Sequence, residues 1–537
     1  MNFKNKSFQQ LPFSALFQNY TAHFEKIAAF YETNPFSAAS IKSRAQSVKF
    51  QGNREKLVEL LLQFNRQFKV DEKAIKNIKK LASGDALALV TGQQLGLFGG
   101  PLYTFYKTIS VIHLARHYEA KLERPVIPVF WMADEDHDFE EVKSVNILTS
   151  NGVKEISLPA NPAESPVSEL TYSRQINAVK RQLKEHLIDT DFSNDLGRLL
   201  DDCFQPENTF LKGFGSFISK LFSKHGLVLA GSNNRPVKEA TKEALIQSVL
   251  QADKVEEALN ETSKRLEQNF HQQVKLNDSH LFYLSPQNGR QKIVRGKESW
   301  ETMGGLQWSA EELAKNIEDD PASFSPDVFL RPIIQDKLLP TLGYVGCPGE
   351  VAYYGQMKSF YRIFDLKMPV IFPRFSATFV EPAIARISQE LPFKFNDYEK
   401  RIEDLEKAYV QQTGEMNIEA VFKKWKKGIE DLEAYHSKLI TQVDETLNGT
   451  SKKAQAHYFN ELERLKGKTY RAIKKNEDIQ MNRIRRIQNN FFPDRNLQER
   501  ALCGIYYMNK YGIDIWDRVL ENLNDSVDLR QHTLIYL

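Results

Sequence analysis

Short apolar runs and longer stretches with helical spacing follow one another along the first 130 residues. Between residues 10 and 82, apolar side chains recur every three or four positions, as in Lys56–Phe64, which predicts helices. Ala86–Val90 and Val126–Trp131 are continuous apolar runs typical of buried strands. A glycine-rich turn and a helical pattern over Tyr103–Tyr118 separate them. Strand, turn, helix and strand together predict a βαβ unit in a parallel sheet.

Further strands are predicted at Gly226–Ala230 and Met368–Phe372, so the core is discontinuous in sequence. Pro128 argues mildly against a central position for its strand, because proline cannot donate to a ladder. Residues 144–185 resemble a polar hairpin leading into helices, and Leu281–Leu284 and Lys292–Arg295 are short strands in an apparent insertion. We expect Thr533–Leu537 to form a short edge strand.

From about residue 396 to 490 the chain is rich in Lys, Glu, Arg and Gln with amphipathic helical spacing. Asn448–Gly449 divides this stretch, and a second helix is expected from Ser451 to Asn489. The pattern predicts an antiparallel helical hairpin of coiled-coil type. Residues 464–486 carry many Lys and Arg, which could bind nucleic acid. We favour a solvated helix face, because no interleaved aromatic platform accompanies the charges.

Composition narrows the class of protein. The net charge is only +3, so the charge alone does not indicate a polyanionic partner. Three separated cysteines form neither a zinc pattern nor a disulfide framework, which fits a reducing compartment. The N-terminus lacks signal-peptide features, and no stretch approaches about 18 apolar residues. We therefore expect a cytoplasmic protein without membrane spans.

The turn from Val90 to Lys107 contains Gly92, Gly96, Gly99 and Gly100 between a strand and a helix. Glycines let backbone N–H groups approach a ligand, and a helix N-terminus favours an anion. Gln93, Gln94 and Lys107 could add polar contacts. The turn is neither a dinucleotide fingerprint nor a Walker motif, and it could also be a plain βα connection.

Three more segments carry candidate chemistry. The first, Trp131–Asp138, places Asp134, Asp136, His137 and Asp138 at the end of a strand, where they could hold a cation, an ammonium group or a ribose, or act as acid and base. Helix capping is the alternative for Asp138.

The second segment is the Gly346–Gly349 turn, which precedes Glu350 in a first helical turn, where a carboxylate also stabilises the helix dipole. Cys347, within this turn, is interpreted as a bystander. The third follows the last predicted strand and contains Arg374, Ser376 and Thr378, which could grip phosphate or form a polar loop.

Together, Thr91–Lys107, Val129–Trp131 with Asp136–Asp138, Gly346–Glu350 and Pro373–Thr378 resemble the bacillithiol-synthesis cysteine-adding family, BshC. The likeness runs from about residue 10 to the C-terminus and includes Leu497–Arg500. It implies a Rossmann-like core similar to class I aminoacyl-tRNA synthetases, two connecting insertions and a helical hairpin used for dimerisation. The division expected is 1–150, 206–250 and 329–395 for the core, 151–205 and 251–328 for the insertions, 396–492 for the arm, and 493–537 for a segment returning to the core.

The resemblance implies a ligase that joins the carboxyl group of L-cysteine to the amine of glucosaminyl-malate and that uses ATP or another nucleotide as its cofactor. Tyr103 and Tyr106 stand where synthetases keep signature histidines, and Arg374–Thr378 stands where they keep a lysine-rich loop. The expected catalytic residues are Lys107, Asp136, His137 and Asp138. The expected nucleotide contacts are Thr91, Gly92, Gln93, Gln94, Gly99, Gly100, Tyr103, Thr104, Arg374, Ser376 and Thr378. The expected substrate contacts are Trp131, Asp134, Gly349, Glu350, Tyr353 and Tyr354.

Two other functions stay open at this point. The chain could be a scaffold that kept a synthetase-like core without catalysis, as the missing histidines suggest. It could also be an RNA-binding relative that uses the basic stripe of the arm. No metal ligand set is predicted, and a homodimer formed through the arm is expected.

Overall fold

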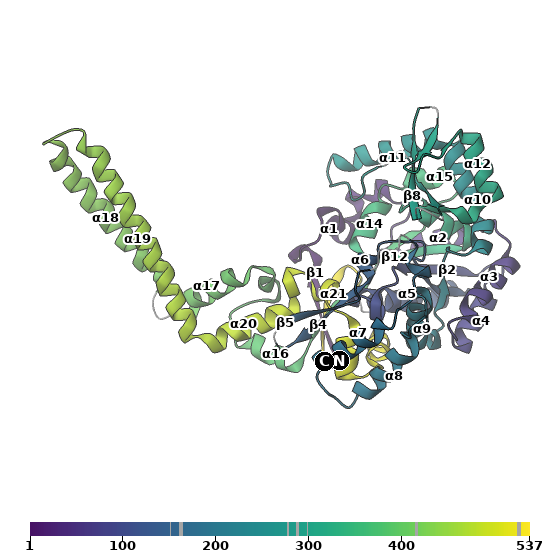
Figure 1. The fold of residues 1–537 in the computed structure, drawn as a ribbon, viewed down its shortest axis with the longest axis horizontal. Helices are drawn as coiled ribbons and strands as arrows, with labels where there is room; N and C mark the ends of the chain where they lie inside the picture. The colour runs from purple at the N-terminus through teal and green to yellow at the C-terminus, as the bar shows by residue number, and fades with distance from the viewer. Residues whose placement is uncertain are drawn as a thin grey trace. The chain divides into compact units, whose positions relative to one another are not determined.

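The computed structural model describes the chain apart from residues 151, 161–164, 277–278, 286–288, 298, 414–416 and 524–527. Two compact units can be distinguished in it (Figure 1). Unit 1 comprises Met1–Thr378 and Glu499–Ile535, and unit 2 comprises Phe379–Gln498 with Tyr536–Leu537. None of the helices in the described ranges is long and apolar enough to cross a membrane.

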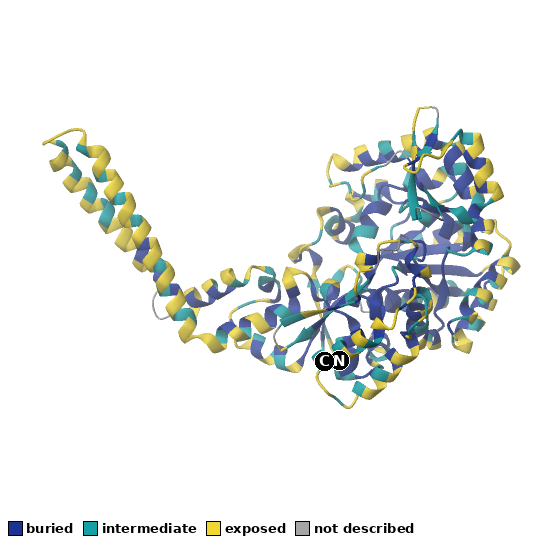
Figure 2. Cartoon of the chain, in the orientation of Figure 1, coloured by how far each residue is buried: buried dark blue, intermediate teal, exposed yellow. Residues whose placement is uncertain are grey.

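A five-stranded parallel sheet forms the centre of unit 1. Its order is β13-β12-β2-β3-β6, and every neighbouring pair is parallel. The strands are buried almost throughout, as the dark blue ribbons in Figure 2 show, which explains their continuous apolar sequences. In sequence order their bounds are β2 Leu87–Gln93, β3 Val126–Met132, β6 Val228–Ala230, β12 Thr341–Gly346 and β13 Val370–Pro373.

The Rossmann-like parallel core predicted from the sequence is therefore confirmed, with the four predicted strands in it. The fifth strand, β12, was not predicted, because its sequence TLGYVG follows Pro340 and contains two glycines that suggest a turn. Gly343 is required there by close packing: an added Cβ would lie 2.7 Å from the Phe372 ring and 2.8 Å from the Val370 carbonyl oxygen. The strand order reverses between β2 and β12, which makes this point the topological switch of the sheet.

The expectation that Pro128 would keep its strand from a central position is wrong. β3 pairs with β2 on one side and with β6 on the other. Pairing with the short β6 begins only at Val129, one residue after the proline, so Pro128 lies outside that ladder. The outer edge of β6 is covered by Asn65, whose side chain accepts from Leu229 N at 3.1 Å and donates to Leu229 O at 2.7 Å.

Helices cover the sheet and come from widely separated parts of the chain. The long helix α5 (Leu102–Leu122) packs on β2, β3 and β12. The predicted N-terminal helices are present, although the strand β1 (Asn2–Ser7) precedes them. The other helices nearest to the sheet and the cavity are α2 Ala38–Ser47, α3 Arg54–Arg66, α4 Glu72–Lys80, α6 Phe139–Val142, α9 Phe210–Phe222, α10 Arg235–Leu250, α11 Ala252–Glu267, α13 Leu330–Leu338, α14 Pro348–Tyr354 and α15 Lys358–Ile363.

Smaller sheets flank this core. The predicted hairpin is β4 (Ser144–Thr149) with β5 (Gly152–Ser157), and an antiparallel sheet has the order β10-β9-β8-β7-β11. The last strand, β15 (Gln531–Tyr536), is not an edge strand, because it lies between β1 and β14 (Ser376–Val380). The sequence alone did not reveal β1 as its second partner. The bounds in this antiparallel sheet are β7 Leu281–Ser285, β8 Gly289–Arg295, β9 Trp300–Thr302, β10 Gln307–Trp308 and β11 Phe324–Pro326.

Unit 2 contains the predicted helical hairpin. α18 (Ile418–Thr441) packs along α19 (Leu447–Asn476), and the unit also contains α16 (Pro382–Gln389), α17 (Ile402–Thr413) and α20 (Asp478–Phe491). The turn lies at residues 442–446, where Asp444 accepts from Thr446 N at 2.9 Å. The predicted break at Asn448–Gly449 is wrong, since both residues lie inside α19; one glycine costs a helix only about 1 kcal/mol. The second helix also ends earlier, at Asn476.

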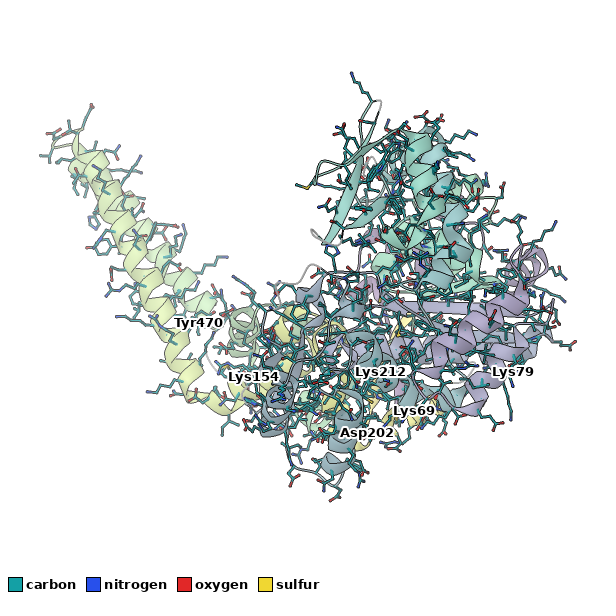
Figure 3. All side chains as sticks on the ribbon, turned by 45° about the vertical axis from the view of Figure 1, so that its right-hand side comes forward. Lys69, Lys79, Lys154, Asp202, Lys212 and Tyr470 are labelled. Atoms are coloured by element: carbon teal, nitrogen blue, oxygen red, sulfur yellow. The ribbon has the colours of Figure 1, made fainter. Side chains whose placement is uncertain are left out.

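The basic stripe of the arm is partly neutralised within unit 2. Lys474 and Arg485 contact opposite oxygens of Glu406 at 2.8 and 2.6 Å, and Lys466 contacts Glu419 at 2.6 Å. Tyr470, labelled in Figure 3, donates to the same Glu419 at 3.0 Å. These contacts favour a solvated, ion-paired helix face over a nucleic-acid surface.

Candidate active site

A cavity of about 620 Å³ opens at the carboxyl ends of the central strands. It includes residues that follow β2, β3, β6 and β12, so it lies at the topological switch point, where open α/β sheets bind ligands. The walls are completed by inserted segments that are remote in sequence. The lining residues are Gly92, Gln93, Gln94, Tyr103, Lys107, Ala133, Asp134, Glu135, Asp136, Glu141, Ser232, Gln273, Val274, Phe282, Arg290, Pro326, Asp327, Val328, Arg331, Cys347, Gly349, Glu350, Tyr353 and Arg500.

About half of the predicted site residues meet in this cavity. Those that line it are Gly92, Gln93, Gln94, Tyr103, Lys107, Asp134, Asp136, Gly349, Glu350 and Tyr353. The remaining predicted residues do not line it: Thr91, Gly99, Gly100, Thr104, Trp131, His137, Asp138, Tyr354, Arg374, Ser376 and Thr378. In the described ranges, no three or more His, Cys, Asp or Glu side chains are grouped as metal ligands would be.

Lys107 joins the two sides of the switch point. Its side chain extends from α5, and the residue is 1% exposed. The ammonium group donates to Gly92 O at 2.7 Å and to Gln93 Oε1 at 3.1 Å, and it forms an ion pair with Glu350 Oε2 at 2.5 Å. All three N–H donors are thus used by the protein, so Lys107 holds the end of β2 against the turn that follows β12.

Glu350 is held in its ionised form from several directions. Its Oε1 accepts from the Tyr344 hydroxyl at 2.6 Å, and Oε2 accepts from Cys347 N at 2.7 Å. Burial raises the pKa of Glu350, but the Lys107 charge and these hydrogen bonds outweigh burial and leave the pKa below its usual value. The carboxylate therefore caps α14 and pairs with Lys107 at the same time.

The glycine turn after β2 does not present a free helix N-terminus. Leu102 N donates to Leu502 O at 2.8 Å, and Thr104 N donates to Pro101 O at 2.9 Å. Gly99 has φ +92°, and an added Cβ would lie 2.7 Å from Phe217 and 2.8 Å from Phe105. The structure therefore does not support the expectation that Gly99, Gly100 and Thr104 cradle a nucleotide: Gly99 permits close packing, the N–H groups of Leu102 and Thr104 are bonded within the protein, and none of the three predicted residues lines the cavity.

Three more predicted residues are structural. Thr91 is fully buried, and its hydroxyl donates to Val345 O at 2.8 Å across the switch point. Trp131 is also fully buried, as is Tyr354, whose ring lies 5.1 Å from that of Tyr353. They support the cavity wall from behind, where a substrate would not reach them.

The acidic residues of the turn after β3 have two different roles, lining the cavity and capping a helix. Asp136 lines the cavity, and its Oδ2 accepts from Gln94 Nε2 at 2.7 Å. Although burial raises its pKa, hydrogen bonds from Gln94 and the turn, together with Arg290, bring the pKa of Asp136 below its usual value. Asp138 instead accepts from Glu141 N at 3.1 Å as the N-cap of α6, so the capping interpretation describes it. His137 lies outside the cavity and contacts Arg290 through Nδ1 at 3.0 Å.

Asp134 is the most unusual acid in the cavity. Its Oδ1 accepts from Ser232 N at 2.9 Å, whereas Oδ2 is buried with no hydrogen-bond partner in the described part of the chain. Burial, reinforced by neighbouring Glu135, raises the pKa of Asp134 to about 7. Lys238, the nearest buried cation, pairs with Glu135 at 3.1 Å instead. Asp134 is therefore a carboxyl group that exchanges its proton near neutral pH.

Arg374 is not available for phosphate. Its guanidinium makes a bidentate ion pair with buried Glu499, at 2.9 and 2.8 Å, and donates to Cys347 Sγ at 3.1 Å. Ser376 donates to Glu499, and both Ser376 and Thr378 contact His532, at 2.8 and 2.9 Å. Apart from Cys347, which is half-buried, these side chains are buried, so the predicted phosphate loop is a closed polar network within unit 1.

The arginines of the cavity were not among the predicted site residues. Arg290 lies on β8, Arg331 on α13 and Arg500 near the C-terminal part of unit 1. Across the described ranges, none of the three has a carboxylate oxygen within 4.0 Å. Arg331 contacts the Tyr353 hydroxyl at 3.4 Å; burial lowers its pKa, but the nearby tyrosines and Glu350 hold the pKa above the usual value. The cavity therefore contains cations suited to anionic ligands.

Comparison with known proteins shows which family this chain matches. Residues 1–375 match the model for "Bacillithiol biosynthesis BshC, N-terminal Rossmann-like domain", and residues 377–537 match "Bacillithiol biosynthesis BshC, C-terminal coiled-coil domain". Curated relatives named "Putative cysteine ligase BshC" include proteins of Salinibacter ruber, 31% identical over 97% of this chain and 96% of the relative, and Koribacter versatilis, 31% identical over 94% of each. A protein of the same name from Bacillus cereus strain B4264 is 29% identical over 90% of each chain.

Proposed function

We propose, because this chain belongs to the bacillithiol-biosynthesis BshC family, that it is a ligase joining the carboxyl group of L-cysteine to the amine of glucosaminyl-malate. The observation that carries the proposal is the composition of the switch-point cavity. One space of about 620 Å³ holds an ionised carboxylate, Asp136, together with three arginines that have no carboxylate partner among the described residues.

The charges of the proposed substrates match these groups. Glucosaminyl-malate carries two carboxylates and an amine, and cysteine carries a carboxylate and an ammonium group. Arg331 and Arg500 are placed in this proposal on substrate carboxylates, because an arginine fork binds a carboxylate with two hydrogen bonds. Asp136 receives the attacking amine, since its position is set by Gln94 and by the backbone of its own turn.

Amide formation from a free carboxylate is uphill in water, so the carboxyl oxygen must first be made a leaving group. A nucleoside triphosphate would supply the phosphoryl or nucleotidyl group for this. Such a group would meet arginines that have no carboxylate partner among the described residues, together with Gln93, Gln94 and Tyr103, but not the closed glycine turn. We place its anionic part near Arg290, because Arg331 and Arg500 are assigned to the substrate carboxylates.

The residues of this chain have distinct tasks in the proposed reaction. The amine nitrogen attacks the activated carboxyl carbon, the carbon–nitrogen bond forms and the activated oxygen leaves. Asp136 takes the proton that the amine must lose, as an ionised carboxylate within the cavity can. Lys107 and Glu350 do not touch the reacting atoms in this scheme; they position the two turns between which the substrates lie.

The test is to incubate the purified protein with ATP, L-cysteine and glucosaminyl-malate and to follow the product thiol by mass spectrometry. Asp136→Asn should lower kcat by about a hundredfold, a common size for loss of a positioned acid–base group. Asp138→Asn, two residues away and used only as a cap, is the matched control and should keep its activity. Equal activity of both variants would contradict the proposal. The absence of product from the wild-type protein, together with a deletion strain that still makes bacillithiol, would also contradict it.

We also propose that the arm pairs with a second copy of this chain. The hairpin exposes large apolar side chains, including Trp425 at 51%, Leu432 at 62% and Tyr458 at 62%. Apolar faces of this kind commonly mark protein interfaces. The molecular mass from light scattering should be that of a dimer, and Trp425→Lys with Leu432→Lys should give a monomer. Lys427→Glu, whose side chain pairs with Asp431 on the hairpin surface, is the control and should remain dimeric.

A further inference from the structure

A second polar cavity, of about 250 Å³, lies at the opposite, amino-terminal end of β12. Its walls come from the end of α2 and the residues after it, from the end of α13, and from the loop that precedes β13. Thr341 at the start of β12 lines it, whereas the candidate active site lies beyond Gly346 at the other end of the strand. The two cavities therefore share no lining residue.

Arg44 forms one wall and has unused bonding capacity. Its side chain is 9% exposed, and the guanidinium donates to Lys367 O at 3.0 Å and to Ser47 Oγ at 3.4 Å. Its Nε is buried and has no hydrogen-bond partner in the described ranges. Burial lowers the pKa of Arg44, partly opposed by the charge of Asp336. Arg44 lines the cavity, and a buried guanidinium without a carboxylate within 4.0 Å among the described residues is suited to a ligand carboxylate.

Asp336 forms a second wall and carries the opposite charge. It is 8% exposed, with Oδ1 accepting from Gln335 at 3.0 Å and Oδ2 from the Tyr361 hydroxyl at 2.8 Å. Burial raises its pKa to about 6. Arg44 and Asp336 influence each other electrostatically, yet the described residues include no ion pair within 4.0 Å between them. Two buried opposite charges thus line one cavity without meeting.

We propose that this cavity binds a free α-amino acid, whose carboxylate lies on Arg44 and whose ammonium group lies on Asp336. A simple anion would satisfy Arg44 but would bring a second negative charge beside Asp336. A zwitterion satisfies both groups and compensates two charges that are costly to bury alone. The volume is below the roughly 300–1,000 Å³ of cavities for drug-sized ligands, which suits a molecule of amino-acid size.

The proposal is tested by calorimetric titration of the full chain with L-alanine, and with acetate and ethylammonium as half-ligands. L-alanine should bind with one-to-one stoichiometry, and each half-ligand should bind about tenfold or more weakly. Asp336→Asn and Arg44→Gln should each weaken L-alanine binding by about tenfold or more. Arg331→Met, which changes only the other cavity, is the control and should leave this binding unchanged.

Three results would overturn the proposal. Binding of acetate as tight as that of L-alanine, unaffected by Asp336→Asn, would make the cavity a simple anion site. Unchanged binding of L-alanine in both variants would place the amino acid elsewhere. No binding at millimolar concentration would leave the cavity to water. If Arg44→Gln fails to fold, because Arg44 also holds Lys367 O, the comparison of Asp336→Asn with the half-ligands still decides.

Discussion

Two strand–turn–helix segments meet at the switch point, and they use their glycines differently. The turn between β2 and α5 is richer in glycine, yet Gly99 and Gly100 pack against the protein and do not line the cavity. The segment from β12 into α14 has fewer glycines, and Gly349, Glu350 and Tyr353, which lie in α14, all line the cavity. A glycine-rich turn after a strand can therefore mark close packing of the chain on itself as well as the approach of a ligand.

The two turns are not independent, because Lys107 of the first segment is paired with Glu350 of the second. The pair is buried on the lysine side and partly open on the other, with side-chain exposures of 2% and 17%. The comparison therefore predicts that damage to the pair affects the whole site, whereas damage to either turn alone has a more selective effect.

Glu350→Gln should have the largest effect. It removes the one carboxylate that lies within 4.0 Å of Lys107 in the described ranges and leaves a buried ammonium group uncompensated. The free energy of unfolding should fall by about 3 kcal/mol, at the lower end for breaking a buried ion pair because Glu350 is partly open. Urea denaturation measures this change.

The double variant Lys107→Met with Glu350→Gln is the control for this prediction. Since it removes both charges, it should be less destabilised than the sum of the two single variants. A loss below about 1 kcal/mol for Glu350→Gln, with additive single effects, would show that the pair does not couple the turns.

Asp134 should give the next largest effect on the free energy of unfolding. Its contribution changes with pH in the opposite direction to that of an acid held ionised by an ion pair. Its pKa is raised to about 7 in the folded protein, so between about pH 4 and pH 7 the folded state binds a proton that the unfolded state has lost. Its contribution is therefore favourable at low pH and is lost as pH rises through about 7, by about 2 kcal/mol between pH 5 and pH 7.

Asp134→Asn should remove this part of the pH dependence, which urea denaturation at several pH values would measure. Glu350, whose pKa is lowered, should contribute no such decline over the same range. Identical pH profiles for the wild type and Asp134→Asn would contradict the raised pKa of Asp134.

Much of the fold could be predicted because buried strands leave continuous apolar runs and amphipathic helices leave a helical periodicity. Ala86–Val90 and Val126–Trp131 did so, and both are core strands. β12 could not be recognised, because a strand buried on both faces can include glycines wherever neighbouring side chains press on its backbone, as Phe372 does on Gly343. The break at Asn448–Gly449 was misplaced because one glycine weakens a helix without ending it.

The site was only partly predictable for a related reason. Residues that follow a strand end, such as Gln94, Asp136 and Glu350, can be found because strand ends converge at one edge of a parallel sheet. Arg290 and Arg331 come from segments whose placement over the cavity depends on tertiary packing, which no local pattern encodes. Arg374 showed the converse, since its position after β13 suggested a ligand contact, but its partner Glu499 lies 125 residues away.

Gly99→Ala tests the closed turn. The new methyl group would overlap the rings of Phe217 and Phe105, and the residue would keep a φ of +92° that alanine rarely adopts. Together these effects should lower the free energy of unfolding by about 2 kcal/mol. KM for both substrates should be unchanged at temperatures where the variant is folded, because Gly99 does not line the cavity. A raised KM without loss of stability would show that this turn contacts a substrate after all.

Gly349→Ala is the matched change in the segment from β12 into α14, and it should have the smallest effect on stability. The nearest atoms to the new methyl group would be those of Gln273, at 3.7 and 3.8 Å, which is ordinary contact. Gly349 lies in the first turn of α14, where alanine is the better helix former, so the free energy of unfolding should stay within about 0.5 kcal/mol or rise slightly. The methyl group projects beside residues that line the cavity, so KM should rise by a factor of about five, as about 1 kcal/mol of lost fit would give. Steady-state kinetics with cysteine and glucosaminyl-malate varied in turn would show which substrate lies against this turn, and unchanged KM values for both would place the substrates away from α14.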